Sequence, residues 1–370
     1  MRRLMLITAL LALAALVTAQ APVAEWSFDE DVAGWDVTDP ASQLTSTIDA
    51  NVTREDDNGV LELSFTPDKA TMSAIVGSVP AGLTAAQSIQ FFAKTTDQTM
   101  IMVALVEADG SNYATGFTSL PDRWQEVSLD LSDFTLGDDS TDENEQLDPD
   151  QVQAIMIADV VTMLAILADQ IPFIIAPDMS PRMLWLDDLW VDVQGVDPRW
   201  VAFDVDGEKG VQVDSFESAP LQWMMLAGSG IEAAYDDELK AEGEFSMRVS
   251  YDLPPNKAFA MLTSLGGIPV AGTTGMRISL LSEVETTLLL EIEELDKSKY
   301  QTMIPLTTGD EFDTVELAWA EFTLSEDSTD ENGQLDITQA KQILFADISA
   351  ITEAPVALNT IWLDDLVLFE

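Results

Sequence analysis

The side chains with the most evident capacity for chemistry form two runs of carboxylate, amide and hydroxyl groups. Residues 134–148 read FTLGDDSTDENEQLD and residues 322–336 read FTLSEDSTDENGQLD, so twelve of fifteen positions agree. Such oxygens are the ligands that Ca²⁺ prefers, and Gly333 suits the glycine position of an EF-hand loop. In that alignment Ser328 and Gln339 replace the entering aspartate and the bidentate glutamate. An EF-hand is therefore not expected. For the acidic turns 138–148 and 326–336, a looser calcium site and a solvated loop both remain open.

The composition excludes several other kinds of chemistry. The chain contains no His and no Cys, which removes Ser-His and Cys-His catalysis, thiol redox chemistry and imidazole or thiolate metal sites. Sixty-six acidic residues against sixteen basic ones give a formal charge of −50, which repels nucleic acid and anionic membranes. No phosphate-binding loop or dinucleotide motif is present. We therefore expect no enzyme, although paired carboxylates of a glycoside hydrolase stay open because acids are so abundant.

The N-terminus has the pattern of a secretory signal peptide. Arg2 and Arg3 precede the apolar segment 4–17, and small residues follow at positions 18–21. The apolar segment is too short for a comfortable membrane span. We expect residues 1–21 to be removed and the mature protein to be secreted or periplasmic.

An internal duplication organises the rest of the chain. The two acidic turns are 188 residues apart, and the same offset relates Trp35 to Trp223. The segment Trp185-Leu-Asp-Asp-Leu189 returns as Trp362-Leu-Asp-Asp-Leu366 at an offset of 177, so the first copy carries eleven extra residues. We predict two homologous domains, residues 22–195 and 211–370, joined by a linker at 196–210 in which 201–205 alternates like a short strand.

Each copy is predicted to be antiparallel β. Alternation of apolar and polar residues is clear in 61–65, 124–131, 247–251 and 315–319, and turn residues recur at short intervals. Residues 150–157 and 337–344, which follow the acidic turns, are predicted to form one short helix each. About 170 residues of short strands predict a two-sheet sandwich, so the fold class is all-β with two tandem jelly-roll domains.

The order of these motifs resembles a known superfamily. Each copy has an opening Phe with an acidic residue and a nearby Trp, then an aromatic-x-x-Val-x-Leu strand in the first copy, the acidic turn, and a closing Trp-Leu-Asp-Asp-Leu strand. This layout resembles galactose-binding-like β-sandwiches, especially the carbohydrate-binding modules of secreted bacterial glycoside hydrolases. The resemblance covers nearly all of both copies, but no catalytic domain accompanies them here.

The resemblance implies a structural calcium ion where the opening acidic residue approaches the closing Asp-Asp strand. Carried onto this sequence, it nominates Asp29 with Asp187 or Asp188 in the first copy. In the second copy it nominates Glu217 with Asp364 or Asp365. Hard oxygen ligands are the kind this chain offers, so Ca²⁺ is the consistent ion. The alternative is that these acids face solvent or accept backbone hydrogen bonds.

Sugar-binding sandwiches of this kind stack exposed aromatic rings on pyranose rings. Trp35, Trp223, Trp185 and Trp362 recur in both copies and are interpreted as core residues. The ligand-binding candidates are aromatic residues outside that set: Tyr113, Tyr235, Tyr300 and Trp319.

The extra residues of the first copy lie within the apolar segment 160–177. Asp169, Gln170 and Pro172 interrupt it, so it is not a membrane span. It is interpreted as an added core element, with an exposed partner interface as the alternative.

The favoured function is a secreted, non-catalytic carbohydrate-binding protein whose partner is a polysaccharide or glycan, with possible structural calcium. A structural or adhesive extracellular protein is the alternative, and a glycoside hydrolase comes third. The sequence leaves the glycan, the oligomeric state and a high-salt origin of the acidity undetermined.

Overall fold

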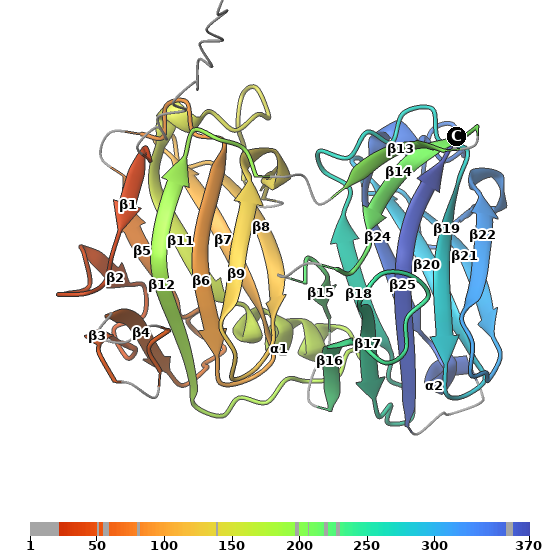
Figure 1. The fold of residues 1–370 in the computed structure, drawn as a ribbon, viewed down its shortest axis with the longest axis horizontal. Helices are drawn as coiled ribbons and strands as arrows, with labels where there is room; N and C mark the ends of the chain where they lie inside the picture. The colour runs from red at the N-terminus through yellow and green to blue at the C-terminus, as the bar shows by residue number, and fades with distance from the viewer. Residues whose placement is uncertain are drawn as a thin grey trace, which may run out of the picture.

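Two β-sandwiches lie side by side in the structure, a computed structural model (Figure 1). It describes residues 22–49, 52–54, 59–79, 82–137, 140–196, 200–205, 207–217, 221–226, 230–352 and 358–370. The expected signal peptide at 1–21 lies outside these residues. Within them, no helix is long and apolar enough to cross a membrane. The predicted all-β fold with two tandem jelly-roll sandwiches is confirmed.

The first sandwich, here called repeat 1, consists of two antiparallel sheets around one apolar core. Its front sheet contains β1 (Ala24–Trp26), β3 (Gln43–Thr47), β4 (Val60–Phe65), β12 (Arg182–Asp192), β6 (Ser88–Thr95) and β9 (Gln125–Asp130). Its back sheet contains β10 (Thr135–Leu136), β8 (Asn112–Ser119), β7 (Thr99–Glu107), β11 (Val152–Asp159), β5 (Ala74–Ser78) and β2 (Trp35–Val37).

Repeat 2 has the same arrangement, with one strand added. Its front sheet contains β13 (Val201–Val205), β14 (Glu208–Asp214), β25 (Asn359–Phe369), β17 (Ser246–Tyr251), β16 (Ile231–Asp236), β19 (Gly275–Ser282) and β22 (Asp313–Ala318). Its back sheet contains β15 (Met224–Met225), β18 (Phe259–Ser264), β24 (Ala340–Asp347), β20 (Thr286–Glu294), β21 (Lys299–Leu306) and β23 (Thr323–Leu324). The added strand β13 comes from the segment predicted as a linker, whose boundaries remain a prediction.

Alternation explains the strands. In β20 the side chains of Leu288, Leu290 and Ile292 are buried in the core, while those between them face outward. The closing strands β12 and β25 lie in the middle of their sheets and pair with strands on both sides. Both carry a register shift at the Asp-Asp pair, where Asp188 and Asp365 have positive φ angles of 42° and 48°.

The two helices predicted after the acidic turns are wrong. Each segment forms a single 3-10 turn, η2 (Pro149–Gln151) or η4 (Ile337–Gln339), and then continues as β11 or β24. The side chains of Val152, Ile155 and Ile157 in β11 are buried. The backbone of β11 pairs with β5 on one side and with β7 on the other. Sheet pairing therefore overrides the local helical pattern. The remaining short elements are η1 (Leu131–Asp133), η3 (Trp319–Glu321) and α2 (Ser349–Thr352).

The two repeats meet along a seam between their back sheets. The backbone N–H of Thr118 in β8 donates to the carbonyl of Leu221, 2.9 Å away, and its hydroxyl donates to the carbonyl of Trp223. Leu120 of repeat 1 belongs to the buried core of repeat 2. These contacts join the edge of one back sheet to the region of β15 in the other.

The apolar insertion of repeat 1 lies at this seam. It forms α1 (Val161–Gln170), whose residues Val161, Leu164 and Ala165 are buried, followed by a loop that reaches repeat 2. There the carbonyl of Phe173 accepts a hydrogen bond from the N–H of Ala258 at 2.9 Å. The ammonium group of Lys257 donates to two further carbonyls of the same loop at 2.8 Å. The insertion is thus a packed element between the repeats, in line with the favoured interpretation.

Each repeat buries an aspartate at the end of its back sheet, and the two have different partners. In repeat 1, Asp159 accepts from Thr99 Oγ1 at 2.7 Å, and Nη1 of Arg182 lies 3.6 Å from its second oxygen. Burial raises the pKa of Asp159, and the charge of Arg182 opposes this. In the register of the closing strands, Arg182 pairs with Phe65 as Asn359 pairs with Tyr251.

In repeat 2 a hydrogen-bond network replaces the arginine. The hydroxyl of Tyr251 donates to Asp347 Oδ2 at 2.5 Å, and Asn359 Nδ2 donates to the tyrosine oxygen at 3.1 Å. The hydroxyl of Thr286 donates to the same carboxylate at 2.9 Å. The two repeats therefore stabilise an equivalent buried aspartate in different ways. The difference lies in one pair of residues, Phe65 and Arg182 in repeat 1 and Tyr251 and Asn359 in repeat 2.

We predict that Arg182→Ala destabilises repeat 1 by about 3–5 kcal/mol, because it leaves a buried carboxylate without its cation. The double variant Phe65→Tyr with Arg182→Asn, which installs the arrangement of repeat 2, should recover most of this loss. Differential scanning calorimetry of the full chain measures both. Equal melting temperatures for Arg182→Ala and the double variant would contradict the prediction.

Candidate metal clusters and ligand surfaces

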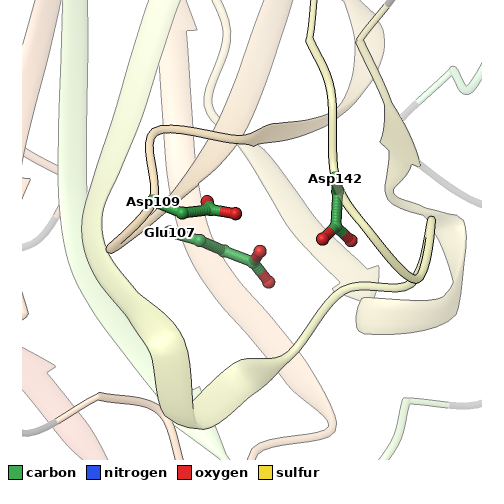
Figure 2. A group of neighbouring side chains, drawn as sticks. All are labelled: Glu107, Asp109 and Asp142. Atoms are coloured by element: carbon green, nitrogen blue, oxygen red, sulfur yellow. The ribbon is translucent and has the colours of Figure 1, made fainter.

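Three carboxylates of repeat 1 converge at one end of the sandwich. Glu107 ends β7, Asp109 lies in the turn before β8, and Asp142 comes from the acidic turn. One carboxylate oxygen of each lies within 4.8 Å of the others, and Figure 2 shows the three groups directed toward a shared space. Glu107 is buried, Asp142 is half-buried and Asp109 is exposed.

Repeat 2 builds the same cluster from Glu294, Asp296 and Asp330, within the same 4.8 Å limit. We call the two groups the acidic clusters. Each joins one residue of the acidic turn to two residues of the preceding hairpin. Because both clusters have the same chemical composition, the arrangement was retained when the sequence duplicated and diverged.

Hydrogen bonds orient the carboxylates of each cluster. In repeat 1 the hydroxyl of Ser111 donates to Glu107 Oε2 and to Asp109 Oδ1, both at 2.7 Å. The backbone N–H of Ser111 lowers the pKa of Asp109. The phenol of Tyr113 donates to Asp142 Oδ2 at 2.5 Å. These donors fix the orientation of the three carboxylates, so the cluster gathers their oxygens in one place.

The acidic clusters could hold a metal ion. Three ionised carboxylates so close together repel one another, and a divalent cation with hard oxygen ligands would offset that repulsion. The sequence analysis considered ligands within the acidic turns and on the opening and closing strands, and it missed Glu107, Asp109, Glu294 and Asp296. A signal was available, because residues 107–113 and 294–300 share the spacing Glu-x-Asp-x-Ser-x-Tyr.

The nominated metal ligands of repeat 1 all have hydrogen-bond or ion-pair partners within the protein. Asp29 Oδ1 accepts from the N–H of Gly59 at 3.0 Å. Asp187 is fully buried; its Oδ2 accepts from Arg54 Nε at 3.1 Å, and a second nitrogen of Arg54 bonds Asp188. Burial raises the pKa of Asp187. A guanidinium cation therefore occupies the place next to the Asp-Asp pair.

In repeat 2 the equivalent acids accept bonds from the protein. Glu217 accepts from the N–H groups of Glu244 and Phe245, while Asp364 Oδ2 accepts from two backbone N–H groups at 2.7 and 3.0 Å. Burial raises the pKa of Asp364 to about 6, and these N–H donors oppose that shift. Asp365 Oδ1 accepts from a glutamine amide at 2.6 Å. Calcium at these positions remains a prediction.

Two of the four aromatic ligand candidates have no exposed ring. Tyr113 is 2% exposed and Tyr300 is 1% exposed, and each donates its hydroxyl to an acidic cluster. Burial raises the pKa of both phenols. Neither ring face is available to a sugar in this structure, because both point into the core from alternating strands.

The other two candidates are partly buried. Tyr235 lies at the seam, where the guanidinium carbon of Arg123 is 5.3 Å from its ring centroid. Trp319 donates its indole N–H to the carbonyl of Thr273 at 3.0 Å and packs on Phe322. In contrast, the recurring Trp35, Trp223, Trp185 and Trp362 are all buried, as predicted.

An aromatic and charged surface lies on the front sheet of repeat 1. We call it the front patch; it consists of Arg54, Gln90, Phe92, Asp188 and Trp190. The rings of Phe92 and Trp190 are 6.3 Å apart between centroids, and the guanidinium of Arg54 lies 3.8 Å from the centroid of Phe92. Ion pairs with the Asp-Asp segment hold Arg54 there.

Repeat 2 has a pocket of about 390 Å³ at the corresponding place on its front sheet. The pocket, here called the hairpin pocket, is lined by Val201, Phe203, Glu208, Gln212, Glu242, Arg277, Asp365 and Val367. Arg277 donates to Glu208 Oε1 at 2.6 Å, and Gln212 donates to Asp365 Oδ1 at 2.6 Å. An aromatic ring, an arginine, an amide and carboxylates are thus gathered around one hollow.

Comparison with protein-family models and with curated proteins finds no match. Among solved structures, a family 11 carbohydrate-binding module from Clostridium thermocellum matches at 17% identity, over 42% of this chain and 93% of the module, with a TM-score of 0.34. The tandem CBM22-1–CBM22-2 domain of Xyn10C from Paenibacillus barcinonensis matches at 11% identity, over 96% of this chain and 99% of that pair, with a TM-score of 0.30. The solved structures that match thus include carbohydrate-binding modules, at low sequence identity.

Proposed function

We propose that this protein is a secreted, non-catalytic carbohydrate-binding protein that binds a polysaccharide or glycan through its front sheets. The observation that carries the proposal is the chemistry shared by the front patch and the hairpin pocket. A sugar presents an apolar ring face that packs on aromatic rings, and hydroxyls that both donate and accept hydrogen bonds. Arginine, glutamine and aspartate side chains beside an aromatic ring match both features.

The two surfaces occupy equivalent places but use different residues. Trp190 of the front patch corresponds to Val367, because Trp190 pairs with Gln90 as Val367 pairs with Arg277. Repeat 2 obtains its aromatic ring instead from Phe203 in the added strand β13. Inheritance alone would have kept the same positions. Retention of the chemistry at changed positions supports a common ligand class.

Binding rather than catalysis is the function that these surfaces support. Their arginines are engaged in ion pairs with Asp188 and Glu208, and Asp365 accepts from Gln212. An adhesive protein that binds a protein or matrix partner is the alternative, and a glycoside hydrolase is the third possibility.

We predict that Trp190→Ala, and separately Phe203→Ala, weakens binding to the glycan by at least about tenfold, because aromatic anchors dominate such contacts. A glycan array of the full chain identifies the ligand, and calorimetric titration with it measures the loss. Met303→Ala is the matched control, since this exposed residue lies on the back sheet of repeat 2.

Different outcomes of that experiment separate the functions. Failure to bind any glycan, combined with binding to extracellular matrix proteins, would favour the adhesive protein. Turnover of chromogenic glycosides that disappears on substituting a front-sheet carboxylate would favour the hydrolase. Glycan binding unaffected by both aromatic substitutions would reject the front sheets as the binding surfaces.

We further propose that structural Ca²⁺ is held by the acidic clusters. The support is the convergence of three oxygen ligands in each repeat, in a chain whose net charge is −50. The ion would tie the acidic turn to the hairpin between the seventh and eighth strands in repeat 1 and to its counterpart in repeat 2. The sites nominated on the opening and closing strands remain the alternative location.

Millimolar Ca²⁺ should raise the melting temperature more than Na⁺ at matched ionic strength, because an ion bound to the native state alone stabilises it. Mg²⁺ should do less, since it requires near-ideal octahedral geometry. Asp109→Asn with Asp296→Asn should remove most of the Ca²⁺-specific increase. The control Glu143→Gln with Glu331→Gln changes the charge equally at exposed positions of the same turns. Loss of the increase in Asp187→Asn or Asp364→Asn instead would move the sites to the closing strands.

A further inference from the structure

The hairpin pocket of repeat 2 and the front patch of repeat 1 differ in charge. Each lies beside the second aspartate of an Asp-Asp pair, Asp188 or Asp365, at the register shift of its closing strand. In repeat 1, Asp188 forms an ion pair with Arg54. In repeat 2, Asp365 Oδ1 accepts from the neutral amide of Gln212 at 2.6 Å. Among the described residues, the equivalent carboxylate thus has a cationic partner in repeat 1 and none in repeat 2.

The loop beside each Asp-Asp pair also changes the sign of its charge. The loop between β3 and β4 is equivalent to the loop between β16 and β17, because β4 and β17 both pair with the closing strands. In repeat 1 this loop places Arg54 against Asp187. In repeat 2 it donates the N–H groups of Ala241 and Glu242 to Asp364. The side chain of Glu242 is exposed and lines the hairpin pocket, so a carboxylate replaces a guanidinium at this place.

The single basic residue in the lining of the hairpin pocket does not balance its carboxylates. Nη1 of Arg277 lies 2.6 Å from Glu208 Oε1 and 3.8 Å from Glu316 Oε1, so its charge is already shared between two acids. Glu242 and Asp365 form no ion pair with the basic residues that the structure describes. Three carboxylates and one guanidinium therefore line the pocket, and negative charge is in excess there.

The rest of the lining shows what kind of cation fits. Phe203 is half-buried, and its ring lies over Gly210, its partner across the β13–β14 hairpin. A metal ion makes no use of this ring. Moreover, the described groups of three acidic side chains close enough to hold a metal ion are the acidic clusters, not this pocket. The pocket therefore suits an organic cation that carries an apolar face.

A sugar ring with an ammonium group has all the features that the pocket matches. Its N–H groups donate charge-assisted hydrogen bonds to carboxylates, its apolar face packs on an aromatic ring, and its hydroxyls bond to amide and guanidinium groups. A sugar acid would meet excess carboxylates in a chain of net charge −50. A neutral sugar would leave Glu242 and Asp365 without a cation.

We propose that the hairpin pocket selects a cationic amino sugar, with Glu242 and Asp365 accepting hydrogen bonds from its ammonium group and Phe203 packing on its ring. This inference rests on the proposed carbohydrate-binding function, for which it names the class of sugar at one of the two surfaces. The front patch lacks this preference, because Arg54 pairs with the Asp-Asp segment there.

The test uses three β-1,4-linked tetrasaccharides that differ only at C2. Cellotetraose carries a hydroxyl there, N-acetylated chitotetraose an acetamido group and deacetylated chitotetraose an ammonium group. Each is titrated calorimetrically into the full chain, in a mildly acidic buffer of low ionic strength that keeps the amine protonated. We expect the ammonium form to bind at least about tenfold more tightly than the hydroxyl form, and added NaCl to reduce this difference.

Conservative substitutions locate the preference. Glu242→Gln and Asp365→Asn should each reduce the preference for the ammonium form several-fold, and asparagine tolerates the positive φ angle of position 365. The matched control Glu238→Gln removes the same charge from an exposed residue of the same loop, outside the pocket lining, and should keep the preference. Trp190→Ala should also keep it, because that residue belongs to the front patch.

The outcomes separate this proposal from the function on which it rests. Equal binding of the ammonium and hydroxyl forms would overturn the amino-sugar preference and leave glycan binding standing. An equal loss in Glu238→Gln would overturn it as well, since the net charge alone would then attract the amine. Competition by putrescine as strong as by the amino sugar would assign the pocket to any organic cation, such as a lysine of a protein partner. Binding of no carbohydrate at all would reject both the preference and the proposed function.

Discussion

The constraint on which this structure depends is a shortage of cations. Sixteen basic side chains face sixty-six acidic ones, so each arginine placed against carboxylates fixes local structure, and carboxylates without one need another solution. Arg54 forms ion pairs with the Asp-Asp segment of repeat 1, Arg182 pairs with Asp159, and Arg277 pairs with Glu208. The acidic clusters receive no arginine or lysine among the described ion pairs, and hydroxyl and backbone donors hold their carboxylates in place instead. The candidate functional sites lie where an arginine has an unusual position, or where the described ion pairs include no basic side chain.

Because the chain is duplicated, each of these groups of carboxylates occurs twice. Comparison of the two repeats shows which of their stabilising partners can differ. Both acidic clusters keep the same residues, which indicates that their geometry tolerates little change. Around the buried aspartates, Phe65 and Arg182 of repeat 1 are replaced by Tyr251 and Asn359 in repeat 2. On the front sheets, Trp190 and Gln90 of repeat 1 are replaced by Val367 and Arg277. Conserved geometry with conserved residues is typical of a site fixed by one ligand chemistry such as an ion. Conserved location with changed residues is typical of surfaces that adjust to different parts of a larger ligand.

The sequence was sufficient for the fold because alternation and duplication are local or repetitive signals. The strands at 61–65 and 247–251, the buried tryptophans and the short strand 201–205 follow from them directly. The helices expected at 150–157 and 337–344 failed because pairing with two neighbouring strands, a long-range interaction, overrides local pattern. Tyr113 and Tyr300 were taken for exposed rings because outward and inward positions of a strand cannot be assigned without knowing which face is the core. The pairing of Arg54 with Asp187 spans 133 residues and leaves no local signal.

The seam shows why a tandem chain can have a property that neither repeat has alone. Repeat 1 supplies β8, which lies next to the short edge strand β10, and the inserted helix α1, while repeat 2 supplies the region of β15 and a lysine that bonds the loop after α1. These contacts bury apolar residues such as Leu120, and such contacts stabilise one relative position of the sandwiches. Polar residues next to this contact then face across a fixed gap rather than into solvent. Because hydrogen bonding depends steeply on distance, polar groups of two surfaces can act together only when their separation is fixed in this way. The eleven inserted residues distinguish repeat 1 from repeat 2. Their contribution comes from where they lie, because they help to set the width of the space between the two repeats.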